Sequence, residues 1–483
     1  MNIDEILTLE GEKFKEKIKE LDNIELLKQL LEDPSLSIEK KEIIKERVKE
    51  LEASRKPIEE KKKIPKARYI FCRFIGAGGC GTTLTLEVYD ELYQNYRSYL
   101  DYCDFTIYDL SAEVKNTYEE FERKYKDANI QMITLELEHG AGKVSKFTDY
   151  ILMIDKEHER IVPCERNYGF ASLGGGTGSR AIPEILKYAK ERGYDCVGIG
   201  VLTDLVNVEF PNHIYTMPLF LKNTDVTIFI DNAAMKEGYD YKEEVCNYVR
   251  KIVLMFEDAL TKPGVREQRR VYPQLQDLSN YKTILGATGL YYSGVKWLIP
   301  FYYECDENED LKPFELIIES IENPLVQIED NEIIEKSLVS IIILGLPPDK
   351  YSEAIKQYRL LKDSLKGLVC DNKEGEILLL ILEDKKVNKL RALVLSYGIP
   401  FKKLNDICEY DKIDESTLDL WINRLKDELQ SLKFRPRFKK YEKRLEEILN
   451  DIERERSKIE DEINGRLKFL KEINEKACER CRI

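Results

Sequence analysis

The stretch YGFASLGGGTGSRAIPEILKY, residues 168–188, decides the fold because it joins three different local patterns. Residues 168–173 are apolar enough for a buried strand, and a helical pattern begins at Ala181. Between them, backbone N–H groups, the hydroxyls of Thr177 and Ser179 and the positive end of the helix can surround phosphate oxygens. The loop consists of Gly174, Gly175, Gly176, Thr177, Gly178 and Ser179. The sequence therefore predicts a phosphate-binding turn in an α/β fold.

A second glycine-rich turn lies upstream and consists of Gly76, Ala77, Gly78, Gly79, Cys80 and Gly81. It follows a predicted strand at 69–75 and precedes a predicted helix at 84–92. Its spacing matches the dinucleotide fingerprint G-x-G-x-x-G, and Asp109 ends the next predicted strand, where an acid can bind a ribose. Taken alone, this turn fits an NAD-type domain or an ordinary tight turn. The sequence has no G-x-x-x-x-G-K followed by Ser or Thr, which excludes a Walker-type phosphate loop.

The loop at 174–179 distinguishes the alternatives, because GGGTGS between a strand and a helix resembles the signature of the tubulin/FtsZ superfamily of GTPases. The chain resembles a divergent FtsZ from about Ala67 to about Gly398. The resemblance implies an α/β fold with a Rossmann-like parallel-sheet GTPase domain, a central helix, a second α/β domain and flanking helical extensions. The expected parts are the N-terminal extension and linker at 1–66, the nucleotide-binding domain at 67–240, the central helix and catalytic loop at 241–282, the FtsZ-like C-terminal domain at 283–400 and the C-terminal extension at 401–483.

The resemblance also implies bound GTP or GDP, with Mg²⁺ held mainly by phosphates and water. Asp109 matches the first acid of the Asp-Leu-Glu motif of tubulin, and Ser111 replaces the second. The sequence HGAGK at 139–143 resembles the loop of FtsZ that senses the terminal phosphate, and comprises Gly140, Ala141, Gly142 and Lys143 after His139. Lys143 is unusual at this place, and it either contacts that phosphate directly or is solvated.

Three further residues are implied to bind the nucleoside. Glu209 ends TDLVNVE, which resembles a family motif whose acid bonds the ribose. Asn232 follows a predicted strand at 226–230, at the place of the family's guanine-reading Asn, although Asp-Asn after a strand is also an ordinary turn. Asn247 stands in the predicted central helix where a second base-reading residue, usually Asp, is expected, so the guanine selectivity stays open.

The catalytic residue implied by the resemblance is Asp277. The stretch DLSNYKT at 277–283 resembles the FtsZ loop that completes the active site of the next subunit and polarises the attacking water. Asn280 replaces the second acid of that loop, and Leu275 stands where an Asn is usual. Hydrolysis is therefore expected but altered. The alternative is that Asp277 is an ordinary surface carboxylate.

Composition narrows the class of protein further. The 483 residues carry 76 Lys and Arg against 90 Asp and Glu, a net charge of −14, which argues against nucleic-acid binding. Eleven scattered cysteines are expected to be reduced thiols of a cytoplasmic protein. Neither a signal peptide nor an apolar run of about 20 residues is apparent. Three scattered histidines make a zinc site unexpected, and no metal site built by the protein alone is predicted.

Both ends of the chain are dense in charge but almost neutral, and both show helical apolar stripes. At the C-terminal end the stripe includes Leu418, Trp421 and Ile422, and Pro436 interrupts it before a longer helix. Such helices either lean on the protein's own core or bind partners and self-associate, for instance as a coiled coil. Cys478 and Cys481 form an isolated C-x-x-C, which is either without a role or a metal or redox site.

Three functions explain these features to different extents. The first is a cytoskeletal GTPase, active in cell division or cell shape, that assembles into nucleotide-dependent filaments and receives Asp277 in trans from the next subunit. The second is a GTP-binding scaffold of the same fold that neither polymerises nor hydrolyses efficiently. The third, an NAD-type oxidoreductase, rests on residues 76–81 and Asp109 alone and leaves residues 174–179 unexplained.

Overall fold

A computed structural model describes residues 11–19, 27, 30–31, 36–54, 70–125, 128–138, 140–235, 240–260, 270–273, 278–329, 331–371, 373–384, 389–454 and 456–481. The chain divides into two compact units, residues 1–68 and 69–483. The finer boundaries expected at 240, 282 and 400 stay predictions. Within the described residues, no helix combines the length and apolarity that crossing a bilayer requires.

The larger unit is built on one sheet, which has eleven strands in the described part of the chain. The strands are β1 (Cys72–Ala77), β2 (Cys103–Ser111), β3 (Ile130–Leu137), β4 (Arg166–Ser172), β5 (Asp195–Leu202), β6 (Val226–Asp231), β7 (Val271–Tyr272), β8 (Trp297–Asp306), β9 (Val339–Leu346), β10 (Glu376–Glu383) and β11 (Lys389–Tyr397). Their order is β3-β2-β1-β4-β5-β6-β8-β11-β9-β10-β7. The first six are parallel and follow the doubly wound order 3-2-1-4-5-6, which confirms the predicted Rossmann-like half.

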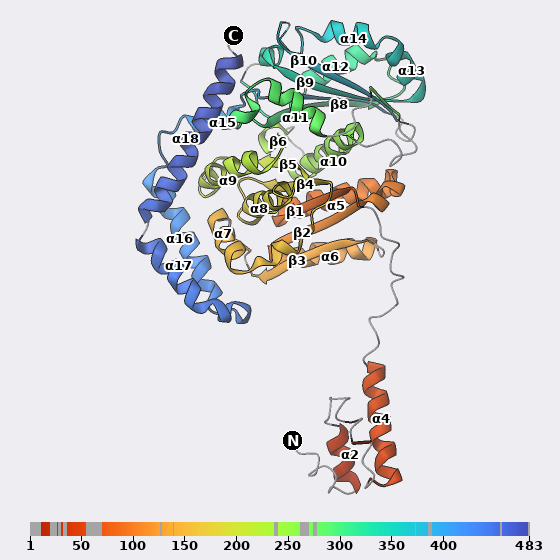
Figure 1. Cartoon of the computed structure of the whole chain (residues 1–483), viewed down its shortest axis with the longest axis vertical. Helices are drawn as coiled ribbons and strands as arrows, with labels where there is room; N and C mark the ends of the chain where they lie inside the picture. The colour runs from red at the N-terminus through yellow and green to blue at the C-terminus, as the bar shows by residue number, and fades with distance from the viewer. Residues whose placement is uncertain are drawn as a thin grey trace. The chain divides into compact units, whose positions relative to one another are not determined.

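Helices follow the parallel strands, and all but α7 pack against the sheet, whereas α7 packs against α8 and α9 (Figure 1). They are α5 (Gly78–Asn95), α6 (Glu113–Lys124), α7 (Ser145–Ile154), α8 (Thr177–Lys190), α9 (Glu209–Asn223) and the central helix α10 (Tyr241–Leu260). Helices α5 and α8 begin inside the two glycine-rich turns, earlier than the side-chain pattern suggested, because glycines carry no apolar side chain that would mark a helical turn. Each turn is therefore itself a helix N-terminus.

The second half of the sheet continues without a break from the first. Strand β8 pairs in parallel with β6 at Thr227 and Trp297, and β11 then pairs antiparallel with both β8 and β9. The helices of this half are α11 (Leu278–Ala287), α12 (Pro313–Ile321), α13 (Pro348–Lys356) and α14 (Tyr358–Leu365). The expected second α/β part is confirmed, and it shares one hydrophobic core with the first.

The two ends of the chain take different forms. Residues 1–68 contain α2 (Gly11–Lys19) and α4 (Ile38–Ser54) with a core of their own, formed by Phe14, Ile18, Leu27, Leu30, Leu36, Ile44 and Val48. The C-terminal end forms α15 (Lys402–Cys408), α16 (Glu415–Leu432), α17 (Glu442–Arg454) and α18 (Arg456–Cys481). Figure 1 shows α16 and α18 alongside α7 and α9, against which they pack.

The predicted apolar stripe of the C-terminal helices is buried. Leu418, Trp421 and Ile422 are at most 3% exposed and belong to the main core. The interpretation that these helices lean on the protein's own core is thus confirmed for this face, which is not available to a partner. Cys481 of the C-x-x-C is buried as well, and no cluster of three or more metal-ligating side chains exists among the described residues.

Candidate functional site

A cavity of about 1040 Å³ opens beyond the carboxyl ends of β1, β2, β4, β5 and β6. In doubly wound sheets this edge is where ligands bind. Most of the residues singled out from the sequence line it: Ala77, Gly78, Gly79, Cys80, Asp109, Gly140, Ala141, Lys143, Gly174, Gly175, Gly176, Thr177, Gly178, Glu209 and Asn232. Of the others, the described residues Gly76, Gly81, Gly142, Ser179 and Asn247 do not line the cavity.

The two glycine-rich turns interlock beside this cavity. A Cβ on Gly178 would overlap the carbonyl oxygen of Ala77, and one on Gly78, whose φ is +69°, would lie 3.0 Å from the amide nitrogen of Gly178. This close approach brings the N-termini of α5 and α8 to one place. Each N-terminus offers unpaired N–H groups and partial positive charge, so together they form a strong anion site.

Three of the residues outside the cavity wall shape these turns. A Cβ on Gly76 or Gly81 would overlap backbone carbonyl oxygens of Gly81 and Phe170, so both glycines allow α5 to lie tightly on β1 and β4. The hydroxyl of Ser179 donates to the carbonyl oxygen of Gly175 and so closes the turn at 174–179 on itself. Their role in the structure is packing behind the cavity.

Asp109 is a buried carboxylate in the cavity wall. It is 3% exposed, and its Oδ1 accepts a hydrogen bond from the Ser111 amide at 3.1 Å. Burial raises the pKa of Asp109 to about 6, although the backbone N–H groups of Ser111 and Leu110 oppose the increase. No described cation pairs with it. A buried acid with a raised pKa in a cavity is typical of functional sites, where a ligand or its metal ion supplies the missing positive charge.

Lys143 and Glu209 lie near the opening of the cavity. The Nζ of Lys143 is 3.4 Å from Oε1 of Glu209, and the lysine side chain is 68% exposed. Such an exposed pair contributes little to stability, so the cation is available to a ligand at small cost. Both interpretations of Lys143, phosphate contact and solvated side chain, remain compatible with this position.

Asn232 also lines the cavity, where it follows β6 and begins a short 3₁₀ turn, Asn232–Ala234. Asn247 accepts a hydrogen bond from Arg250 in the next turn of α10 and stands outside the wall. Lys242 and Cys246 line the cavity instead. The sequence analysis missed them, although their spacing of four places them on one face of the helix.

Two buried hydroxyls in the wall were also missed. Oγ1 of Thr82 and Oγ1 of Thr203 find no hydrogen-bond partner among the described residues. Buried polar groups are normally satisfied, so these two atoms fit a cavity that receives a polar ligand. The thiols of Cys80 and Cys246 are different in character, because burial raises the pKa of each to about 12 and keeps them neutral.

The candidate catalytic residue cannot be placed. Asp277 lies outside the described residues, as do Leu275 and His139. Asn280 is described and lies in the first turn of α11. The catalytic role of Asp277 therefore stays a prediction.

The comparison with solved structures decides the fold. No family model matches the sequence. A mutant FtsZ from M. jannaschii superposes with a TM-score of 0.51 over 69% of this chain and 94% of its own, at 15% sequence identity. The chain has an FtsZ-like fold.

Two other FtsZ-like structures match over similar lengths. An empty FtsZ dimer from M. jannaschii gives 16% identity, 75% and 93% coverage and a TM-score of 0.49. A GTPγS-bound protofilament of CetZ2 from Haloferax volcanii gives 13% identity, 68% and 92% coverage and a TM-score of 0.48. The FtsZ-like assignment rests on the first match and concerns the fold. The predicted resemblance is confirmed at that level, and its bounds at about Ala67 and about Gly398 stay predictions.

Proposed function

We propose that this protein binds GTP in the cavity at the carboxyl edge of its FtsZ-like sheet. The observation that carries the proposal is the convergence of the two helix N-termini, at Gly78 and Thr177, with Gly140, Ala141 and Lys143 around one cavity. A triphosphate carries the charge that such a site needs, and the cavity volume of about 1040 Å³ accommodates a nucleotide.

Individual side chains suit the parts of the nucleotide. Asn232 at one end can read the edge of a base, and Glu209 can accept a hydrogen bond from a ribose hydroxyl. Lys143 can pair with a phosphate. Magnesium would be held by phosphate oxygens and water with Asp109 as a nearby carboxylate, which matches the usual sparse protein coordination of Mg²⁺; the ion would neutralise charge on the phosphates.

We further propose that the chain assembles into filaments and hydrolyses GTP between subunits. In this proposal Asp277 of one subunit orients the attacking water at the nucleotide of the next, and hydrolysis weakens the contact. Support comes from the FtsZ-like fold and from the resemblance of residues 277–283 to the catalytic loop.

The second candidate is a GTP-binding scaffold of the same fold without efficient hydrolysis. Asn280, in the first turn of α11, favours it, because an amide cannot accept a proton from water as a carboxylate can. Ser111 in place of an acid beside the cavity points the same way.

GTP turnover, measured with sedimentation over a series of protein concentrations, separates the two. The filament proposal predicts turnover per subunit that rises above a critical concentration together with pelleting. Asp277→Ala should then abolish turnover and leave GTP binding intact, whereas Arg444→Gln, which removes an exposed ion pair with Glu447 on α17, should leave both unchanged. GTP binding without turnover or pelleting at any concentration would overturn the filament proposal and support the GTP-binding scaffold.

A further inference from the structure

Asn212 is a buried amide in α9 that connects three separate segments of the chain. It is 0% exposed. Its Oδ1 accepts hydrogen bonds from the amide and the hydroxyl of Ser145, at 3.0 and 2.8 Å, and from Nε1 of Trp421 at 2.9 Å. Its Nδ2 donates to the carbonyl oxygens of Lys143 and Gly174, at 2.6 and 2.9 Å.

These contacts fix the orientation of the amide. The oxygen faces three donor atoms, and the nitrogen faces two carbonyl oxygens, so a flipped amide would oppose donors to donors and acceptors to acceptors. A fully satisfied amide in a dry interior is a rigid connection. Asn212 therefore holds its partners in one arrangement.

Two of those partners belong to loops of the cavity. Lys143 and Gly174 both line it, whereas Asn212 and Trp421 do not. Lys143 has a φ of +62°, a left-handed conformation that costs a non-glycine residue energy and persists only where the surroundings hold it. The hydrogen bond from Asn212 to the carbonyl oxygen of Lys143 stabilises this conformation. Asn212 thus acts on a ligand through these two loops.

The third partner, Trp421, belongs to the C-terminal helices. Its side chain is 0% exposed, and its ring lies 5.8 Å from that of Tyr215, one turn beyond Asn212 on α9. On the same helix as Trp421, Glu428 covers Gly142, where a Cβ would overlap its carboxylate. Helix α16 therefore touches the loop at 140–143 directly and also through Asn212.

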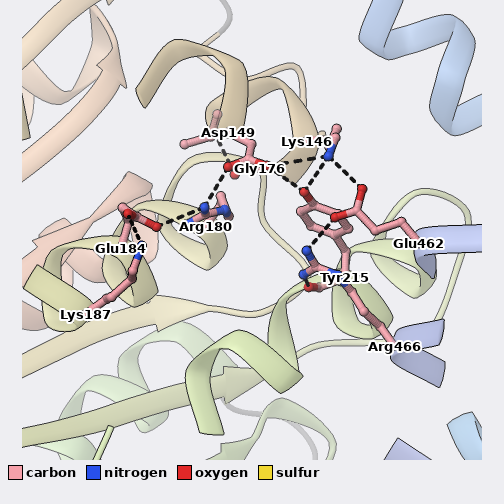
Figure 2. A network of polar contacts seen from close by, with 10 residues as sticks. Lys146, Asp149, Gly176, Arg180, Glu184, Lys187, Tyr215, Glu462 and Arg466 are labelled. Carbon is pink, nitrogen blue, oxygen red and sulfur yellow. Dashed lines mark hydrogen bonds and ion pairs between the residues drawn. The ribbon is translucent and has the colours of Figure 1, made fainter. Parts of the chain in front are cut away.

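Helix α18 reaches the same region by a second route, shown in Figure 2. Glu462 accepts a hydrogen bond from Lys146 at 2.7 Å, and Lys146 also donates to the hydroxyl of Tyr215 at 2.9 Å. That hydroxyl donates to Asp149, which pairs with Arg180 of α8 at 2.6 Å. Helix α7, which carries Lys146 and Asp149, begins directly after Lys143 and Val144. This second route ends at α7 and α8, the two helices that begin at the cavity loops.

We propose that Asn212 is a positioning residue for the two phosphate-facing loops and that Trp421 makes the C-terminal helices a working part of the nucleotide site. The proposal rests on the GTP-binding function proposed above. By linkage, docking of these helices and nucleotide binding stabilise each other by the same factor. Residues 401–483 then act on the cavity from behind, without entering it.

The test uses the full chain and three variants. Trp421→Phe keeps an aromatic side chain but removes the N–H donor, and Asn212→Asp keeps the shape and the acceptor but loses both donations to the loops. Arg456→Gln is the matched control, because it removes an exposed ion pair with Asp419 on the same helices without touching Asn212. Two quantities are measured for each: amide hydrogen exchange of residues 140–143 and 174–176 without nucleotide, and affinity for a fluorescent GTP analogue.

We expect faster exchange in both loops and a GTP affinity about three- to tenfold lower for Trp421→Phe, with a larger loss for Asn212→Asp. Arg456→Gln should match the wild type. The chain has two tryptophans, so a change of emission on GTP binding that Trp421→Phe abolishes assigns the signal to Trp421 rather than to Trp297.

The outcomes separate the two proposals. Loops that loosen in both variants while no form of the protein binds GTP would uphold the positioning role of Asn212 and overturn the proposed nucleotide. Wild-type binding of GTP, with exchange and affinity in Trp421→Phe and Asn212→Asp equal to those of Arg456→Gln, would overturn the positioning role and leave GTP binding standing.

Discussion

The two charge-dense ends of the chain resemble each other in sequence and differ in structure. The described residues of the N-terminal end form a compact unit with its own small core, which includes Phe14 and Ile44. The C-terminal end adds Trp421 and the rest of its apolar stripe to the core that carries the cavity. The comparison teaches that charge density and helical periodicity report that a helix is amphipathic, but not what covers its apolar face.

The largest expected effect comes from deleting the C-terminal end, and deletion of the N-terminal end is its counterpart. Removing residues 401–483 uncovers the apolar faces of α7 and α9, and each large apolar side chain lost from the core is worth about 1.5–3 kcal/mol, so the sum exceeds ordinary domain stability. We expect an aggregated or unfolded product. Removing residues 1–66 should leave the thermal midpoint of the larger unit and its GTP affinity unchanged. Thermal unfolding of both deletion variants, followed by circular dichroism, measures the difference. Equal effects of the two deletions would contradict the contrast between the two ends.

One buried aromatic side chain at each end of the chain tests the same difference between the two ends. Trp421→Ala leaves a cavity and unpaired polar groups around Asn212, and we expect it to lower the free energy of unfolding of the larger unit by about 3–5 kcal/mol. Phe14→Ala is its counterpart in the N-terminal unit, where Phe14 is also 0% exposed. It should leave the main transition in place. Denaturant titration monitored by near-UV circular dichroism measures both, and a shift of the main transition by Phe14→Ala would contradict the division.

Lys403 tests a contact of the C-terminal end with β6, directly before the cavity residue Asn232. Its Nζ lies 2.5 Å from Oδ1 of Asp231, the residue before Asn232, and both side chains are buried. Lys403→Met leaves the carboxylate without its cation. We expect a loss of about 3 kcal/mol in the free energy of unfolding, the lower end of the usual range, because Asp231 keeps its hydrogen bond from the Ala233 amide. The double variant Lys403→Met with Asp231→Asn should recover the lost stability, because it removes the unpaired charge as well. An unchanged stability of the single variant would show that the ion pair does not stabilise the fold.

Asp109→Asn tests a buried residue of the cavity wall. Unlike the variants above, we expect it to raise the free energy of unfolding. Because the folded-state pKa is raised to about 6, the folded protein binds this proton more tightly than the unfolded chain does. The charged carboxylate therefore costs stability above about pH 6, and the cost disappears below about pH 4. We expect the variant to gain at most about 3 kcal/mol near neutral pH and almost nothing near pH 4. Denaturant titrations at the two pH values measure the difference, and an equal effect at both would show that burial of the charge is not the cause.

The fold and most of the cavity wall followed from local sequence. Each glycine-rich turn lies between a strand and a helix that are its immediate neighbours, and parallel strands bring their carboxyl ends to one edge, so distant turns such as 76–81 and 174–179 meet there. Position along a helix is harder to predict. Neighbouring residues point about 100° apart, and so Cys246 rather than Asn247 faces the cavity.

The part that sequence reasoning missed depends on contacts between distant segments. Asn212 meets Ser145 across 67 positions and Trp421 across 209, and no local pattern marks an amide that makes five hydrogen bonds to four residues. Its neighbours along the chain, Pro211 and His213, carry no signal of this role either. Burial and hydrogen-bond partners in the folded chain were needed to find it.

The central claim is that the cavity holds GTP, and calorimetric titration of the full chain with GTP, ATP and NAD⁺ tests it most directly. The account predicts that GTP saturates a single site per chain, that ATP and NAD⁺ bind more weakly, and that Asn232→Ala reduces this preference. Absence of GTP binding at any attainable concentration, or tighter binding of NAD⁺ than of GTP, would contradict it.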